Sequence, residues 1–104
     1  MKNITFEVCV DTIKGATDAA MLGADRIELC DALGIGGTTP SAGIMKAAAK
    51  LAKPIYAMIR PRGGDFIFNF EDMDVMLHVI DRCRHYGMAG IVIGVTHENG
   101  VLDY

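Results

Sequence analysis

The chain has 104 residues, of which 51% are apolar and 22% are charged, and its formal net charge is -3. This balance is typical of a single globular domain and excludes a disordered chain. The ten basic residues are scattered along the chain, so no charged surface for nucleic acid is predicted. No apolar run approaches the length of about 18 residues that a membrane span requires, so no membrane association is expected.

The cysteine content and the first residues indicate the compartment. Three cysteines, an odd number, argue against a disulfide framework. Residues 1–4 lead directly into a predicted strand, without the apolar region of a signal peptide. We therefore expect a cytoplasmic protein.

The first third of the chain predicts a strand, a helix and a second strand. Residues 4–10 are the first strand, and Asp11 or Thr12 can cap a helix that runs to about Leu22. The second strand, residues 26–30, follows within a few residues. Such short links between strand, helix and strand are typical of a βαβ unit, which requires a parallel sheet.

The pattern continues after a glycine-rich loop. Thr39 is the predicted cap of a second helix, with Pro40 at its first position, and that helix ends before Pro54. Residues 55–59 are continuously apolar, as expected of a strand that is buried on both faces.

A second loop leads into the last two predicted elements. Asn69 caps a third helix, whose acidic first turn suits the positive end of the helix dipole. Residues 90–94 form the fourth strand. The resulting order β-α-β-α-β-α-β fits either a small open doubly wound sheet or the first half of a (β/α)8 TIM barrel, which needs about 250 residues.

The first two strands are apolar on one face only. Because side chains alternate along a strand, Glu7 and Cys9 share one face, as do Glu28 and Cys30. Helices cover both faces of an open doubly wound sheet, so its central strands should be apolar on both. A barrel interior accepts polar layers when charges pair across it, and we expect Arg60 to meet the glutamates there. The α/β barrel, with strands one to four present, is therefore favoured.

Two cysteines stand where TIM-barrel sites are built. Cys9 and Cys30 lie at the carboxyl ends of two predicted neighbouring strands. Thiolates are the soft ligands that select Cu(I), so this pair is a candidate metal site. The alternative interpretation is that both are buried and act as small apolar residues. Cys83 falls on the apolar stripe of the third helix and is expected in the core.

A second group of residues suggests an enzyme. Glu7 and Glu28 are candidate general acid and base groups, although the alternative is a buried layer of ion pairs. The candidate anion-binding residues follow the third strand and comprise two arginines and two glycines: Arg60, Arg62, Gly63 and Gly64. Arginines grip phosphate or carboxylate, and a Gly-Gly turn exposes backbone N–H groups, but the same residues also suit a tight turn.

Four stretches resemble a known family. They are Glu-Val-Cys-Val-Asp at 7–11, Gly-Ala-Asp-Arg-Ile-Glu-Leu-Cys at 23–30, Gly-Gly-Thr-Thr-Pro-Ser at 36–41 and Met-Ile-Arg-Pro-Arg-Gly-Gly-Asp-Phe at 58–66. Together they resemble the copper homeostasis protein CutC family over residues 6–94.

This resemblance implies a TIM-barrel fold, a cytoplasmic location and a role in Cu(I) binding and trafficking. It also points to Cys9 and Cys30 as copper ligands. Family members carry a complete barrel, so residues 1–104 are expected to form a partial CutC-like TIM-barrel domain, the N-terminal half.

Three functions remain open from the sequence. The first is Cu(I) binding by the two thiols without catalytic turnover. The second is a barrel enzyme that acts on a small anionic substrate, with a glutamate base and an arginine grip. The third is an inactive half-barrel, whose unpaired first and fourth strands favour a homo-oligomer.

Overall fold

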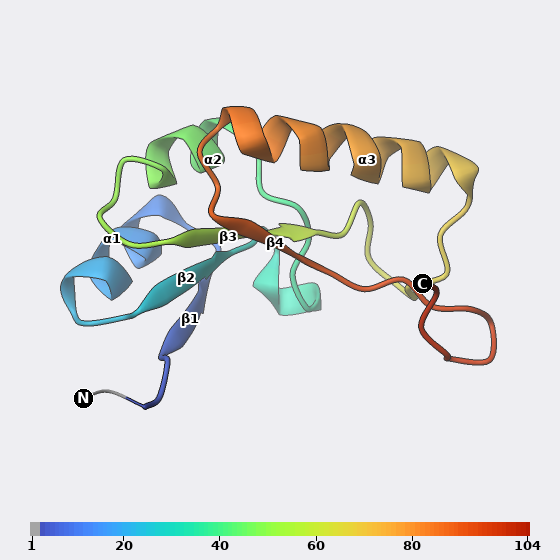
Figure 1. Ribbon diagram of the computed structural model, residues 1–104, viewed down its shortest axis with the longest axis horizontal. Helices are drawn as coiled ribbons and strands as arrows, with labels where there is room; N and C mark the ends of the chain where they lie inside the picture. Colours follow the sequence, from blue (N-terminus) through green and yellow to red (C-terminus); the bar gives the residue numbers. More distant parts are fainter. Residues whose placement is uncertain (1–2) are drawn as a thin grey trace.

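Four parallel strands form one sheet in the computed structural model, which describes residues 3–104 (Figure 1). The sheet follows the order of the chain, β1-β2-β3-β4, and every neighbouring pair is parallel. The strands are β1 (Glu7–Val10), β2 (Arg26–Leu29), β3 (Ile55–Ile59) and β4 (Gly90–Ile93). This sequential order confirms the predicted α/β fold and leaves β1 and β4 as the two edges.

Each pair of consecutive strands is joined through one α-helix, as parallel pairing requires. The helices are α1 (Ile13–Met21), α2 (Ala42–Ala48) and α3 (Phe70–His85), and a short 3-10 helix, η1 (Leu33–Ile35), lies between β2 and α2. In Figure 1, α2 and α3 lie above the sheet and η1 lies below it. None of the described helices is long and apolar enough to cross a bilayer.

The core lies between the three helices and one face of the sheet. That face supplies alternate residues of the strands, and the helices supply Ala16, Met45, Ala48, Met76 and Cys83. From β2, Ile27 and Leu29 are fully buried. Burying side chains of this size stabilises the fold by roughly 1.5–3 kcal/mol each. Cys83 is a core residue as predicted, with its sulfur 3.9 Å from that of Met45.

The opposite face of the sheet carries the polar residues. Glu7, Arg26 and Glu28 alternate with the core residues of β1 and β2, and their burial is only intermediate. A sheet with helices on one face and a polar second face is the arrangement of a barrel wall, whose second face looks into the barrel. The polar second face therefore agrees with the predicted partial barrel.

Two of the three predicted helix caps are confirmed. Thr12 accepts a hydrogen bond from the Gly15 N–H, and Asn69 forms a capping box with Asp72. The predicted cap Thr39 is wrong, because Ser41 caps α2 and accepts from the Ile44 N–H.

The Thr39 hydroxyl is used elsewhere, accepting a hydrogen bond from the Arg60 N–H at 2.9 Å. The first strand is also shorter than residues 4–10 and begins at Glu7. Its ladder starts there because the N–H groups of Asp25 and Arg26 both donate to the Phe6 carbonyl.

Candidate metal centre at the carboxyl ends of β1 and β2

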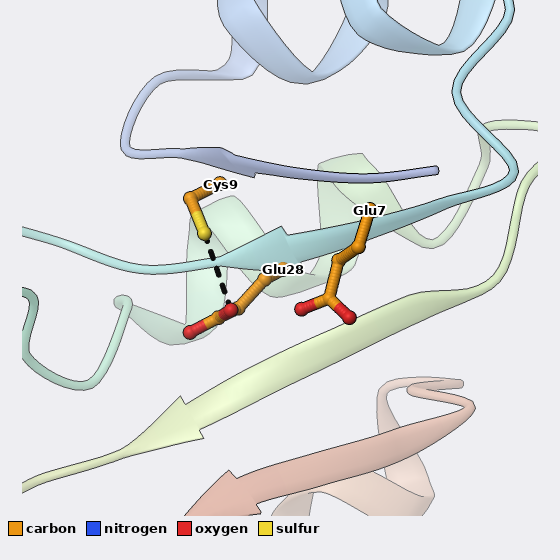
Figure 2. A group of neighbouring side chains, drawn as sticks. All are labelled: Glu7, Cys9 and Glu28. Carbon is orange, nitrogen blue, oxygen red and sulfur yellow. Dashed lines mark hydrogen bonds between the residues drawn. The ribbon is translucent and has the colours of Figure 1, made fainter. Parts of the chain in front are cut away.

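Parallel pairing of β1 with β2 brings a thiol and two carboxylates together. Cys9 lies opposite Glu28 in the register, and Glu7 lies one pleat earlier on the same face. Figure 2 shows the carboxylate of Glu28 next to the sulfur of Cys9, with the carboxylate of Glu7 nearby. One ligand atom from each of Glu7, Cys9 and Glu28 lies within 4.8 Å of the others.

Glu28 contacts both of the cysteines predicted as ligands. The Cys9 thiol donates to Glu28 Oε2 at 3.2 Å, and the Cys30 thiol lies 3.8 Å from Glu28 Oε1. The carboxylate therefore lies between the two sulfurs and engages one with each oxygen. Both thiols of the predicted pair contact this one carboxylate, although the group of mutually close ligand atoms comprises Glu7, Cys9 and Glu28 and does not include Cys30.

The two thiols differ in exposure. Cys9 is exposed on the edge strand, whereas Cys30 is only 2% exposed. The loop after β2 covers Cys30, since Gly37 adopts φ +93° and a Cβ there would lie 3.3 Å from the Cys30 sulfur. A bridge between Asp31 and Thr38 closes this loop. One sulfur therefore faces solvent and the other lies beneath the loop.

Both thiols have raised pKa values. Burial, followed by the hydrogen bond and charge of Glu28, raises the pKa of Cys9 to about 11. Cys9 lies exposed on the edge strand, and the carboxylates of Glu28 and Glu7 beside its sulfur disfavour its ionised form. Burial and the charge of Glu28 raise the pKa of Cys30 to about 12. Both are therefore thiols at neutral pH, and a metal ion must displace their protons.

Arg26 completes the polar layer. Its Nε and Nη2 both lie 2.6 Å from Glu7 Oε2, and its guanidinium group stacks 4.8 Å from the centre of the Tyr56 ring. The hydrogen bond with Glu28 and the pairing with Arg26 lower the pKa of Glu7. This role of Arg26 was not predicted from the sequence, because it depends on the register of β1 and β2, which places Arg26 directly opposite Glu7.

The expectation that Arg60 meets the glutamates is wrong. Its guanidinium group donates instead to the carbonyl oxygens of Ile35, Gly37 and Gly64 at 2.8–3.0 Å. Arg60 follows the last residue of β3, where the chain leaves the sheet, so its side chain enters the loops rather than the polar layer. It is only 7% exposed and ties the loop after β2 to the loop after β3.

Arg62 is likewise engaged within its own loop. It donates to the carbonyl oxygens of Gly63, Asp65 and Ile67 and forms an ion pair with Asp72 of α3. Anion binding by Arg60, Arg62, Gly63 and Gly64 stays a prediction. It requires these donors to exchange carbonyl oxygens for an anion.

Comparison with known proteins shows which family the chain resembles. The model of the CutC family matches residues 4–104. A CutC family protein of Rhizobium meliloti is 54% identical over 103 residues, which cover 99% of this chain and 42% of that protein. One from Vibrio atlanticus is 49% identical over 102 residues, or 97% of this chain and 41% of that protein.

A solved structure agrees with these relatives. It is described as a copper homeostasis protein CutC from Streptococcus agalactiae, and it superimposes with a TM-score of 0.90 at 34% identity. The match covers 96% of this chain and 50% of that one. The chain thus spans about half of the solved structure and less than half of the curated relatives, as expected of a partial barrel. It belongs to the CutC family.

Proposed function

We propose that this chain serves copper homeostasis by binding Cu(I) through Cys9 and Cys30 in the cytoplasm, without catalytic turnover. Its family membership supports the link to copper, since a solved relative is described as a copper homeostasis protein. The observation that carries the ligand assignment is the position of Glu28. Its two oxygens contact the two thiols, so both sulfurs lie beside the same carboxylate, which supports their assignment as a ligand pair.

The chemistry of the two sulfurs suits this ion. Cu(I) is soft and prefers thiolates, which select it over harder ions. Exposure of Cys9 provides access for a copper donor, and burial of Cys30 keeps one ligand away from solvent. The carboxylates of Glu7 and Glu28 add negative charge around the cation.

An anaerobic titration tests the proposal. The 104-residue chain is titrated with Cu(I) in competition with a chromophoric Cu(I) chelator. We expect one equivalent of Cu(I) to bind. The double substitution Cys9→Ser, Cys30→Ser should weaken binding by at least about 100-fold, because loss of a residue that only orients a metal ligand already costs up to about 100-fold.

Cys83→Ala is the matched control. Cys83 is the third cysteine, lies in the core and contacts Met45, so its loss should leave copper affinity unchanged. Unchanged stoichiometry and affinity in the double variant would refute the assignment of Cys9 and Cys30.

A further inference from the structure

We infer that Glu7, Cys9 and Glu28 form a second metal-binding mode, for a borderline divalent cation of the Zn²⁺ class. This mode goes beyond the proposed copper function because it uses two carboxylates and does not require Cys30. The two modes share only Cys9. The argument rests on the spacing, charge and donor types of the three side chains.

The spacing suits such an ion. The three ligand atoms lie within 4.8 Å of one another. With Zn–S near 2.3 Å and Zn–O near 2.0–2.2 Å, sulfur and oxygen ligands of a tetrahedral site lie about 3.6 Å apart. Cys9 Sγ and Glu28 Oε2 are already 3.2 Å apart. Small side-chain rotations of Glu7 therefore complete the set.

The charges of the residues match a divalent ion. Two carboxylates and one thiolate contribute three negative charges, and Arg26 beside Glu7 returns one positive charge. The sum of -2 balances a 2+ cation. Both short contacts of Arg26 are with Glu7 Oε2, so Oε1 is the oxygen turned from that ion pair. Arg26 orients the Glu7 ligand as an outer partner does in many metal sites.

The donor types separate this mode from the copper mode. Two oxygens and one sulfur suit a borderline ion such as Zn²⁺, whereas Cu(I) prefers sulfur alone. Cys30 is buried with its thiol directed at the other oxygen of Glu28, 3.8 Å away. Cys30 therefore contacts Glu28 from outside the group of three ligand atoms. Because Cys9 is exposed, the group is accessible to an ion from solvent.

Cobalt provides the test, since Co²⁺ reports its ligands through visible and near-ultraviolet absorption. The 104-residue chain is titrated anaerobically with Co²⁺, and then with Zn²⁺ to displace it. We expect one equivalent, tetrahedral d–d bands and a thiolate-to-cobalt charge-transfer band. Glu28→Gln and Glu7→Gln should each weaken Co²⁺ binding by at least about tenfold.

Cys30→Ser keeps a hydrogen-bond donor beside Glu28, so it should weaken Co²⁺ binding much less than Cys9→Ser does, while it weakens Cu(I) binding strongly. Failure of this inference and failure of the copper proposal are therefore distinguishable. Glu98→Gln, in an exposed loop, is the matched control. Circular dichroism checks the fold of each variant. If the Glu28→Gln variant does not fold, the Glu28→Asp variant is used instead. The shorter side chain of aspartate holds the carboxylate farther from the ion, so Co²⁺ binding should also weaken.

Two results would overturn the inference. One is a Co²⁺ affinity that survives substitution of Glu28 and Glu7. The other is an equal loss in Cys30→Ser and Cys9→Ser, which would reduce the site to the thiol pair.

Discussion

At the residue scale, one carboxylate contacts both candidate thiols. Glu28 accepts from Cys9 at 3.2 Å and faces Cys30 at 3.8 Å. Its negative charge opposes ionisation of both sulfurs, so an exposed thiol is held in its protonated form. A cation would be attracted by the same charge that suppresses the thiolate.

Alkylation of Cys9 tests whether the charge of Glu28 opposes ionisation of the thiol. The pKa of Cys9 rises from 9.0 to about 11, so the rate with iodoacetamide should keep rising with pH through about 11 rather than level off near 9. At pH 8 the thiolate fraction of Cys9 is lower by about 100-fold than that of an unperturbed thiol. A thiolate of higher pKa is a stronger nucleophile, which recovers part of this loss. We therefore expect alkylation to be slower by about one to two orders of magnitude.

Mass spectrometry of the alkylated peptide gives the rate for Cys9 alone. Glu28→Gln removes the charge and should speed the reaction, whereas Glu98→Gln should not. A rate for the unaltered chain that saturates near pH 9 would contradict the role of Glu28.

At the scale of elements, the register between neighbouring strands determines which side chains meet on the polar face. Tyr56 lies opposite Gly90, and its ring occupies the space that a side chain at Gly90 would fill. Arg26 stacks on that ring and pairs with Glu7. A single line of contacts therefore crosses all four strands on the polar face, from Glu7 to Gly90.

Substitution at Gly90 tests this line. A Cβ there would lie 2.5 Å from Tyr56 Cε1 and 2.7 Å from Cδ1, so Gly90→Ala must displace the ring. We expect a loss of about 1–3 kcal/mol in the free energy of unfolding, as for other overpacked sites. Urea denaturation measures it.

A double-mutant cycle provides the control. In a Tyr56→Ala background the ring is gone, so Gly90→Ala should cost much less. Equal costs in both backgrounds would show that the ring does not account for the effect.

At the scale of the whole molecule, β1 and β4 are the edges of the sheet. Within residues 3–104, each of them pairs with one neighbouring strand. Val8 on β1 is 37% exposed and Ile93 on β4 is 46% exposed. The chain covers only 42% of its Rhizobium meliloti relative, whose additional length is not represented here. Parallel edges with exposed apolar residues are templates for pairing with another chain.

We therefore expect the 104-residue chain to self-associate. Sedimentation velocity should show species larger than the monomer that increase with protein concentration. Val8→Lys and Ile93→Lys, which place charges on the two edges, should shift the distribution toward monomer. A stable monomer of the unaltered chain across the concentration range would refute the expectation.

Much of the fold could be predicted because its signals are local. The alternation of strands and helices and the caps at Thr12 and Asn69 each depend on a few neighbouring residues. Glu7 and Cys9 could be placed on one face because side chains alternate along any strand. The second helix cap failed because Thr39 and Ser41 are both suitable residues, and Thr39 is engaged by the distant Arg60 backbone.

Local patterns of residues were enough to predict the order of elements, the polar face of the first two strands and the resemblance to the CutC family. They could not predict which charges pair or which group lies between the thiols. Glu28 bridges Cys9 and Cys30, and Arg26 rather than Arg60 binds Glu7. The physical reason is that these contacts depend on the register between strands and on the path of the loops. Both are set by packing among residues far apart in the chain.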